Sequence, residues 1–376
     1  MLRPEDCPDI EVLSHFAEAR RETVPGLRLE ATRAAARRFK SAFQDRGPAR
    51  SVRTFDLITF PYPTRYALQG AALSPAPYVM MRNRVQLVQV ESGGRIVNVL
   101  INPSDPERSM AAPFFARQVE RFGELIARRV MSTVHGRVED HLRSVGVSRE
   151  SIDYITFDHL HVQDLRGMLG TERPEPGNDA PTPALFPNAK LLVQREELDT
   201  VAHVHPMQRD WYVDGALTGV DGDRIVVLGG DVQLGQGLAL IRTPGHTGGN
   251  HTPVLLTDGG VWTISENGVC VDAYAPEASE IAGVRRFARD GDVEVVLNAN
   301  TRESSLDQYT SMVLEKTVAD RCPDRPEFPQ HFSSSEMVRS RLAPGLRPTY
   351  SHASISHGEV TPERAAASTT DSSAVA

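Results

Sequence analysis

Cysteine and long apolar runs are scarce in this sequence. Three cysteines occur in 376 residues, at Cys7, Cys270 and Cys322, and none belongs to a Cys-x-x-Cys pair, so a disulfide framework or a thiol redox motif is excluded. An odd, low cysteine count fits a reducing compartment. No run approaches the roughly 18 apolar residues of a membrane helix, and acidic residues occupy the first dozen positions where a secretory signal needs its apolar region. We therefore predict a cytoplasmic protein without membrane contact.

An excess of positive charge is also missing. The formal net charge is −8, and 24% of the residues are charged, which gives no electrostatic footprint for nucleic acid. No serine lies in a Gly-x-Ser-x-Gly elbow, so nucleophilic serine catalysis is disfavoured. The glycine-rich segment 229–237 lacks the following helix and Lys-Ser/Thr of a phosphate loop and predicts hairpin turns. The 40% hydrophobic content suits a soluble enzyme with a substantial core and a small-molecule substrate. The composition is also compatible with a homo-oligomer.

The chain divides into three predicted parts. Residues 1–50 are rich in arginine and alanine and predict a helical extension packed on the core. Residues 51–320 carry the strand and helix patterns of a mixed α/β domain. Residues 321–376 form a C-terminal extension, and from about residue 351 their low apolar content predicts a disordered tail. The proline-rich stretch 173–183 predicts a long loop, either a specificity element at the substrate mouth or a plain surface connection.

Strand patterns occur at 52–60, 78–81, 85–90, 96–101, 151–157, 186–193, 225–228, 238–243 and 293–297. Helix patterns occur at 112–130 and 139–145, and at Leu165, Met168 and Leu169.

Two histidine-bearing segments carry the chemistry. His159 and His161 follow a predicted buried strand, and His246 lies in the turn Thr243-Pro244-Gly245-His246-Thr247 after another strand. A His-x-His pair in a loop is by itself a weak signal. With the second segment it becomes informative, because neutral imidazoles on rigid strand ends are what a metal ion requires. The sequence therefore predicts a metal site.

These residues resemble the metallo-β-lactamase fold superfamily, whose signature is His-x-His-x-Asp-His with a later Pro-Gly-His-Thr turn. His159 and His161 match the first two ligands, and His246 matches the third. The resemblance extends from about Arg53 to about Tyr309. It implies an αββα sandwich, in which two mixed β-sheets are flanked by helices.

The chain departs from the family pattern at the second metal site. Gln163 stands where the family has its aspartate, Asp164 where it has the next histidine, and Asn298-Ala299-Asn300 replaces a later histidine. Glu266 is the best counterpart of the bridging aspartate. Amide groups are weaker ligands than carboxylates or imidazoles, so we predict one tightly held ion with His159, His161, His246 and Glu266 as ligands.

Two residues are predicted to act in catalysis. Asp164 is placed either as a ligand of a second, weaker ion or as the proton acceptor for the attacking water, and Glu266 is the other candidate acceptor. A divalent ion, with zinc preferred and iron or manganese as alternatives, lowers the pKa of water and polarises a carbonyl oxygen.

The predicted function is a metal-dependent hydrolase that cleaves an ester, lactone, thioester or related bond. The first alternative is a mononuclear non-haem iron oxygenase of the same fold. The second is a catalytically silent binding protein that has kept the fold.

The other histidines are given weaker roles. His203 and His205 predict a polar helix end or a lid. His251 either orients a metal ligand through a hydrogen bond or is an ordinary strand residue. The remaining ones, His15, His135, His141, His331, His352 and His357, are expected on the solvated surface.

Overall fold

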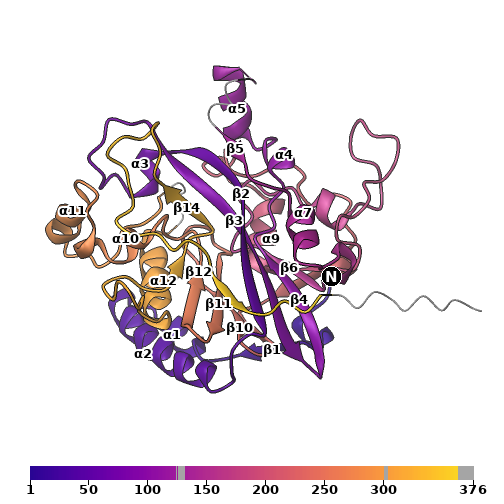
Figure 1. The fold of residues 1–376 in the computed structure, drawn as a ribbon, viewed down its shortest axis with the longest axis horizontal. Coiled ribbons are helices and arrows are strands. Elements are labelled where there is room, and N and C mark those ends of the chain that lie inside the picture. The colour runs from indigo at the N-terminus through magenta and orange to yellow at the C-terminus, as the bar shows by residue number, and fades with distance from the viewer. Residues whose placement is uncertain (124, 126–131, 300–303, 363–376) are drawn as a thin grey trace, which may run out of the picture.

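Two β-sheets packed face to face form the centre of the molecule (Figure 1). The computed structural model describes residues 1–376 except 124, 126–131, 300–303 and 363–376. The first sheet has six strands, in the order β1 (Ile10–Leu13), β9 (Asp231–Leu234), β10 (Leu238–Arg242), β11 (His251–Thr257), β12 (Gly260–Ile264) and β13 (His331–Phe332). Its neighbours are antiparallel except for the parallel pair β12 and β13.

The second sheet has nine strands. Its main path runs β15 (Ser356–Gly358), β2 (Ser51–Pro63), β3 (Tyr78–Ser92), β4 (Arg95–Ile101), β6 (Tyr154–Thr156), β7 (Lys190–Gln194) and β8 (Ile225–Leu228), with β14 (Ser335–Val338) beside β3 and β5 (Thr133–Val134) beside β2. Strands β4, β6, β7 and β8 are parallel to one another. The carboxyl ends of parallel strands meet at one edge, and ligands bind there in open α/β sheets.

Alternation along the strands explains why the sheets form a sandwich. On β10, Leu238 and Leu240 pack between the two sheets, whereas Ala239 and Ile241 face the helices on the outside. Successive side chains of a strand point to opposite faces, so a strand that is apolar on both faces must be covered twice. Each fully buried leucine or isoleucine stabilises the fold by about 1.5–3 kcal/mol.

Helices supply that outer cover. α2 (Pro25–Gln44) and α12 (Ser305–Val318) lie together under the six-stranded sheet (Figure 1), and Phe39 and Phe43 of α2 pack onto it. On the far side, α7 (Val138–Ser144), α8 (Arg166–Leu169) and α9 (Arg195–Ala202) pack on the nine-stranded sheet. Among the described residues, the further α-helices are α1 (Ala17–Arg21), α3 (Thr64–Ala67), α4 (Pro106–Ser109), α5 (Pro113–Phe122), α10 (Val271–Tyr274) and α11 (Val284–Gly291), and the 3-10 turns are Pro4–Asp6, Arg149–Ser151, Gly222–Arg224 and Pro276–Ala278. The predicted αββα sandwich is confirmed.

Some predicted elements differ from the observed ones. The strands predicted at 78–81 and 85–90 are parts of one continuous strand, β3. Residues 293–297 lie outside the sheets, although 295–297 are buried, because the amide of Val296 bonds to the carbonyl of Ala273 on α10 instead of to a strand. The helix predicted over 112–130 is observed as α5, and its predicted second half falls largely outside the described residues.

Segments near both ends of the described chain pair with strands of the sheets. Residues 1–50 were predicted to be helical, yet β1 forms an edge of the six-stranded sheet beside β9. The segment after residue 320 contributes β13 and β14, so it is no separate extension. Residues 351–362 were predicted to be disordered, but β15 pairs with β2 over Ser356–Gly358. The rest of the predicted tail, 363–376, lies outside the described residues.

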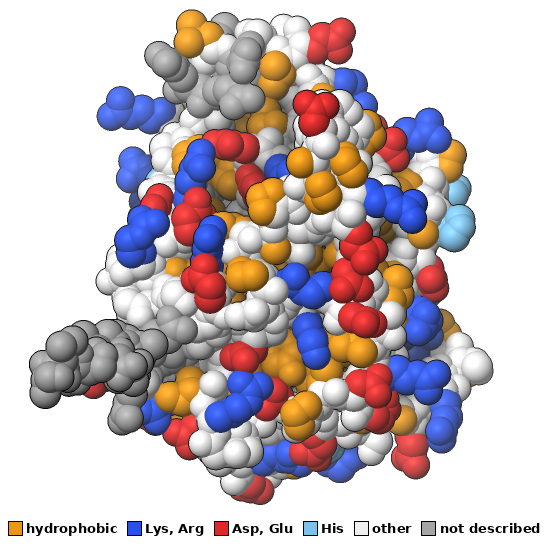
Figure 2. All heavy atoms as spheres, turned by 90° about the vertical axis from the view of Figure 1, so that its right-hand side faces the viewer, with side chains coloured by type: hydrophobic (Ala, Val, Ile, Leu, Met, Phe, Trp, Pro, Cys, Tyr) orange, Lys and Arg blue, Asp and Glu red, His pale blue; other side chains and the backbone are white. Residues whose placement is uncertain are grey.

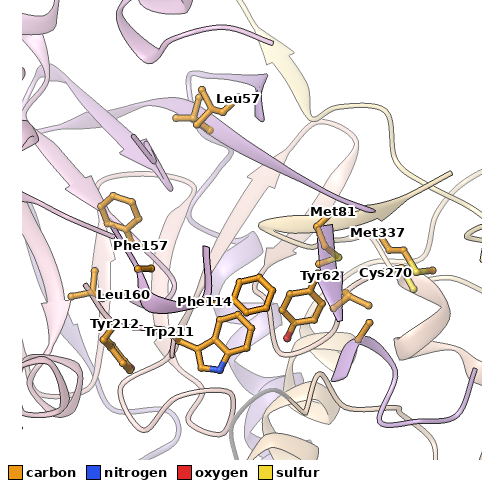
Figure 3. Close-up of a cluster of buried hydrophobic side chains, with 14 of the residues drawn as sticks. Leu57, Tyr62, Met81, Phe114, Phe157, Leu160, Trp211, Tyr212, Cys270 and Met337 are labelled. Carbon is orange, nitrogen blue, oxygen red and sulfur yellow. The ribbon is translucent and has the colours of Figure 1, made fainter. Parts of the chain in front are cut away.

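An aromatic cluster lies beside the histidine segments. Trp211 stacks on Phe114 with ring centroids 4.7 Å apart and lies 5.8 Å from Tyr62 (Figure 3). Aromatic pairs at such distances add about 0.5–1.5 kcal/mol to the gain from burial. The cluster belongs to the core on the helix side of the nine-stranded sheet.

The surface carries charges of both signs. On the face shown in Figure 2, acidic and basic side chains are interleaved around scattered hydrophobic ones. Within the described part of the chain, no helix has the length and apolar character needed to cross a membrane.

Candidate metal centre

Three histidines from two distant segments meet at the end of the sandwich. The ligand atoms of His159, His161 and His246 all lie within 4.8 Å of one another, and each ring is buried. The ring centroid of His159 is 4.7 Å from that of His161 and 4.6 Å from that of His246. The structure thus brings together the three imidazoles that the sequence predicted to share one ion.

The first ligand loop follows directly from β6 and has a strained backbone. Val162 has a φ of 58°, which is a true outlier for a β-branched residue. Its amide donates to the backbone carbonyl of Trp211 at 2.6 Å, and this bond holds the loop in its conformation. Strain of this kind costs about 1–3 kcal/mol and is concentrated at functional sites.

Asp158 is the nearest charged group to the first ligand. Its Oδ2 lies 3.2 Å from Nδ1 of His159 and also accepts the backbone N–H of Glu266 at 2.8 Å. Burial alone would lower the pKa of His159, but the Asp158 carboxylate outweighs it and raises that pKa to about 9. Since Asp158 faces Nδ1, Nε2 is the nitrogen that His159 offers to an ion, as in carboxylate–histidine–metal triads.

The third ligand lies in a closely packed turn after β10. The backbone N–H of His246 donates to Oδ1 of Asn267 at 3.2 Å, and Nδ2 of Asn267 donates to the buried carboxylate of Glu315 at 2.8 Å. Burial lowers the pKa of His246 to about 3, so this imidazole is neutral, which metal binding requires. A side chain at Gly249 would overlap the backbone of Glu197, so glycine is needed there.

Glu197 of α9 joins the two ligand segments. It is 1% exposed, and its Oε1 accepts the backbone N–H of Leu160, between the first two ligands, at 2.8 Å. Its Oε2 accepts the hydroxyl of Thr247, next to the third ligand, at 2.6 Å. Oε1 also accepts the hydroxyl of Tyr212 at 3.0 Å. One buried carboxylate therefore fixes both segments relative to each other.

Glu266 follows β12 and faces the cavity beside the histidines. Its carboxylate accepts the hydroxyl of Ser334 at 3.3 Å, but its oxygens lie outside the histidine group defined above. Burial raises the pKa of Glu266 to about 7, although His159 acts in the opposite direction. A carboxyl group with a pKa near neutrality is suited to accept and return a proton.

Asp164 is held away from the histidines. Both carboxylate oxygens bind arginines, with Arg166 Nε at 2.8 Å and Nη2 at 2.7 Å, and Arg108 Nη1 at 3.0 Å. The same arginines bind Glu175 in the proline-rich loop. The structure therefore gives Asp164 the role of anchoring this loop, and does not place it with the predicted ligands or at the cavity wall.

Two amide residues of the altered second site, Gln163 and Asn298, lie beside the metal centre. Gln163 lines the cavity, and its Nε2 donates to Oγ of Ser104 at 2.9 Å. Asn298 is fully buried; its carbonyl lies 3.5 Å from Nδ1 of His246, and its Nδ2 donates to the carbonyl of Glu266 at 3.1 Å. Asn298 thus supports the metal centre instead of supplying an imidazole. Asn300 lies outside the described residues.

The other histidines take different places. His251 bonds through Nε2 to Oγ1 of Thr156 at 2.9 Å, on the strand before the ligand loop. His203 and His205 are exposed beyond the end of α9. His331 and His352 were expected at the surface, but their exposures are 0% and 4%. Their bonds to Thr263 Oγ1 and to the Pro329 carbonyl satisfy one nitrogen of each ring, which permits burial.

A cavity of about 90 Å³ opens at the histidines. Its wall is partly apolar, with Ile58, Phe60, Met110, Phe115 and Trp211, and partly polar, with uncharged amides and hydroxyls. His159, His161 and Glu266 lie on this wall, so a small molecule in the cavity reaches both the metal centre and the carboxylate.

The donor set fits a divalent ion such as zinc. Zinc prefers imidazole nitrogens, and catalytic sites use three protein ligands with an open position. Here three buried imidazoles converge, one is oriented by a carboxylate and one by a backbone carbonyl, and the group borders a cavity. The αββα sandwich with a histidine centre at its end is the arrangement implied by the resemblance to the metallo-β-lactamase superfamily.

Comparisons with known proteins find similar solved structures only at low identity. No protein-family model matches the chain, and no curated protein matches it. AidC, a dizinc quorum-quenching lactonase, is 12% identical with a TM-score of 0.46, over 84% of this chain and 97% of that one. A quorum-quenching N-acyl homoserine lactone lactonase is 16% identical with a TM-score of 0.43, over 66% and 90%. A probable metal-dependent hydrolase from Staphylococcus aureus is 14% identical with a TM-score of 0.41, over 58% and 73%. At such identities we interpret the site from its own geometry.

Proposed function

We propose that this protein is a metal-dependent hydrolase that cleaves an ester, lactone, thioester or related bond. The observation that carries the proposal is the convergence of His159, His161 and His246 beside a cavity that also contains the Glu266 carboxylate. A bound divalent ion would supply Lewis-acid activation of water and of the substrate carbonyl. Zinc suits the three imidazoles, and iron or manganese remain compatible with them.

The chain's own residues give the reaction its geometry. Glu266 lines the cavity, and in this proposal it accepts the proton of the attacking water and returns it to the leaving group. Asp158 orients His159 and carries the negative charge that offsets the centre's positive charge. The apolar wall excludes bulk water from the part of the cavity where an acyl group would lie. Glu266 takes this role in place of Asp164, whose oxygens are occupied by arginines.

Metal content and turnover test the proposal together. The purified protein is expected to bind about one equivalent of a divalent metal, and His159→Ala and His246→Ala are expected to lose it. The metal-loaded parent is expected to hydrolyse members of an ester, lactone and thioester panel, and Glu266→Gln to keep its metal but lose most of that activity. Substrate-dependent oxygen uptake would instead favour the iron oxygenase, and equal metal content in the histidine variants would overturn the proposal.

A further inference from the structure

A buried stripe of polar side chains on α12 contacts the turn that carries His246. This polar stripe consists of Gln308, Ser311 and Glu315, which are 3%, 4% and 0% exposed. Their spacing of three and four residues places them on one face of the helix. Burying polar groups costs free energy unless they find hydrogen-bond partners, so the partners of the polar stripe indicate what it does.

Gln308 holds two backbone carbonyls beside the third ligand. Its Nε2 donates to the carbonyl of Asn298 at 2.7 Å and to that of Asn267 at 2.9 Å. The Asn298 carbonyl is also the group that lies 3.5 Å from Nδ1 of His246. Gln308 therefore fixes the position of the carbonyl that orients this imidazole ring.

Ser311 bonds to the turn itself. Its Oγ donates to the carbonyl of Pro244, two residues before His246, at 2.7 Å. The turn and the helix are also in direct contact, because a Cβ added to Gly245 would lie 2.2 Å from Cα of Gln308. The position of the turn is therefore set by α12, through one hydrogen bond and one close backbone contact.

Glu315 extends this support to the backbone of His246. Its Oε1 accepts Nδ2 of Asn267 at 2.8 Å and Oγ1 of Thr252 at 2.6 Å, and its Oε2 accepts the hydroxyl of Tyr274 at 2.7 Å. The Asn267 amide is thereby held with Oδ1 towards the backbone N–H of His246, which it accepts at 3.2 Å. The polar stripe thus supports the ring, the turn and the backbone of the third ligand.

The helix that carries the polar stripe is itself held at both ends by α2, which lies beside it (Figure 1). Arg28 pairs with Asp307 near the start of α12 at 2.8 Å. Nζ of Lys40 donates to the carbonyl of Ala319, just after the end of α12, at 3.0 Å. The polar stripe therefore lies on a fixed element, which a positioning role requires.

We infer that the three residues of the polar stripe are positioning residues that orient His246 for the metal ion. The inference rests on the proposed function, because it assigns residues that support the metal centre of the proposed hydrolase. The first two ligands are supported from elsewhere, by Asp158 and Glu197. Disturbing the polar stripe should therefore loosen the third ligand while the other two keep their places.

Binding of Co²⁺ by the purified protein tests this role. Gln308→Met has nearly the same shape but donates no hydrogen bond, so two carbonyls beside His246 lose their donor. We expect the Co²⁺ affinity, measured by competition with a chelator, to fall by about 10- to 100-fold, as when a group that supports a ligand is lost. The visible absorption of the bound Co²⁺ should change as well, because it reports the number and geometry of the ligands.

Two variants of Ser311 separate the hydrogen bond from the shape of the side chain. Ser311→Ala removes the bond to the Pro244 carbonyl and keeps α12, because alanine favours a helix, and the affinity is expected to fall by about tenfold. Ser311→Thr retains a hydroxyl and should bind Co²⁺ like the parent. Equal losses in both variants would count against the inference.

Matched controls lie outside the polar stripe. Gln194→Met removes another buried glutamine, whose Nε2 donates to the carbonyl of Gly230, before β9. Thr310→Ala changes the neighbour of Ser311, whose hydroxyl bonds within the helix to the carbonyl of Leu306. Both variants should keep the affinity and the absorption of the parent, whatever their effect on the unfolding temperature.

A polar stripe that merely stabilises the fold gives a different result. If Gln308→Met and Ser311→Ala lower the unfolding temperature but bind Co²⁺ with the affinity and absorption of the parent, the inference is overturned. If Gln308→Met does not fold, Ser311→Ala decides alone. Hydrolysis of the ester, lactone and thioester panel is a separate measurement. A parent that binds Co²⁺ but cleaves none of the panel refutes the proposed hydrolase, and the Co²⁺ measurements still decide the role of the polar stripe.

Discussion

Replacing Glu197 should weaken metal binding although Glu197 is not itself a predicted ligand. Glu197→Ala removes the acceptor from the N–H of Leu160 and from the hydroxyls of Tyr212 and Thr247. Hydrogen bonds to charged groups are worth about 1.5–3 kcal/mol each, so three of them together amount to at least about 4 kcal/mol. Because Leu160 and Thr247 adjoin the histidine ligands, part of this loss must appear as looser ligand geometry.

We expect Glu197→Ala to lower the metal affinity by about 10- to 100-fold, the usual effect of losing a residue that supports the ligands. Affinity is measured by competition with a chelator, and stability by thermal unfolding with and without the ion. Glu197→Gln keeps an acceptor for the Leu160 amide and should lose less. Glu196→Gln is the matched control on the same helix, because Glu196 forms a partly exposed ion pair with Arg242, and solvent-screened pairs contribute about 0–1 kcal/mol. If Glu197→Ala lowers the unfolding temperature yet binds the ion as tightly as the parent, the carboxylate merely stabilises the fold and our reasoning is refuted.

Two other perturbations follow from the packing. Gly249→Ala should destabilise the protein and reduce its metal content, because a Cβ there overlaps the backbone of Glu197, whereas Gly229→Ala, with open space around its Cβ, should be close to neutral in urea unfolding. A second prediction concerns acid: burial lowers the pKa of His352 to about 4 and that of His331 to about 3, against about 6.5 in the unfolded chain. Below pH 6.5 the unfolded state therefore binds more protons, so the stability present above that pH is lost as the pH falls towards 4. His352 alone should account for about 2 kcal/mol between pH 7 and pH 5. His352→Gln should reduce the change in the free energy of unfolding between pH 7 and pH 5 by that amount, as measured by urea unfolding at each pH. An unchanged pH dependence would contradict the argument that burial lowers the pKa of His352.

The ligand histidines were predictable because their signal is local. Strand patterns precede both histidine segments, and a metal requires ligands at rigid strand ends, so their convergence followed from topology. Glu197 gave no such signal, since its role depends on the distance between α9 and two loops that are remote in sequence. Asp158 directly precedes the His-x-His pair, so its carboxylate is a local sequence signal for a residue that orients His159.

The residues placed differently by the structure depend on tertiary partners. Asp164 looked available for catalysis, but Arg108 on α4 and Arg166 bind it, and the pairing with Arg108 is invisible in local sequence. His331 and His352 are polar by type, yet the hydrogen bonds to Thr263 and Pro329 let them be buried. The segment 293–297 has a strand composition, but its amides bond elsewhere. Hydrophobic periodicity reports which faces are apolar and says nothing of such specific partners.

The pairing of β1 and β15 with the sheets bears on how the protein can be shortened. Removal of residues 1–50 would strip β1 from β9 and leave a row of unpaired backbone groups along a hydrophobic strand. Removal of residues 351–362 would expose the β2 edge that β15 covers. Bare strand edges template intermolecular pairing, so versions trimmed to residues 51–320 should aggregate when expressed.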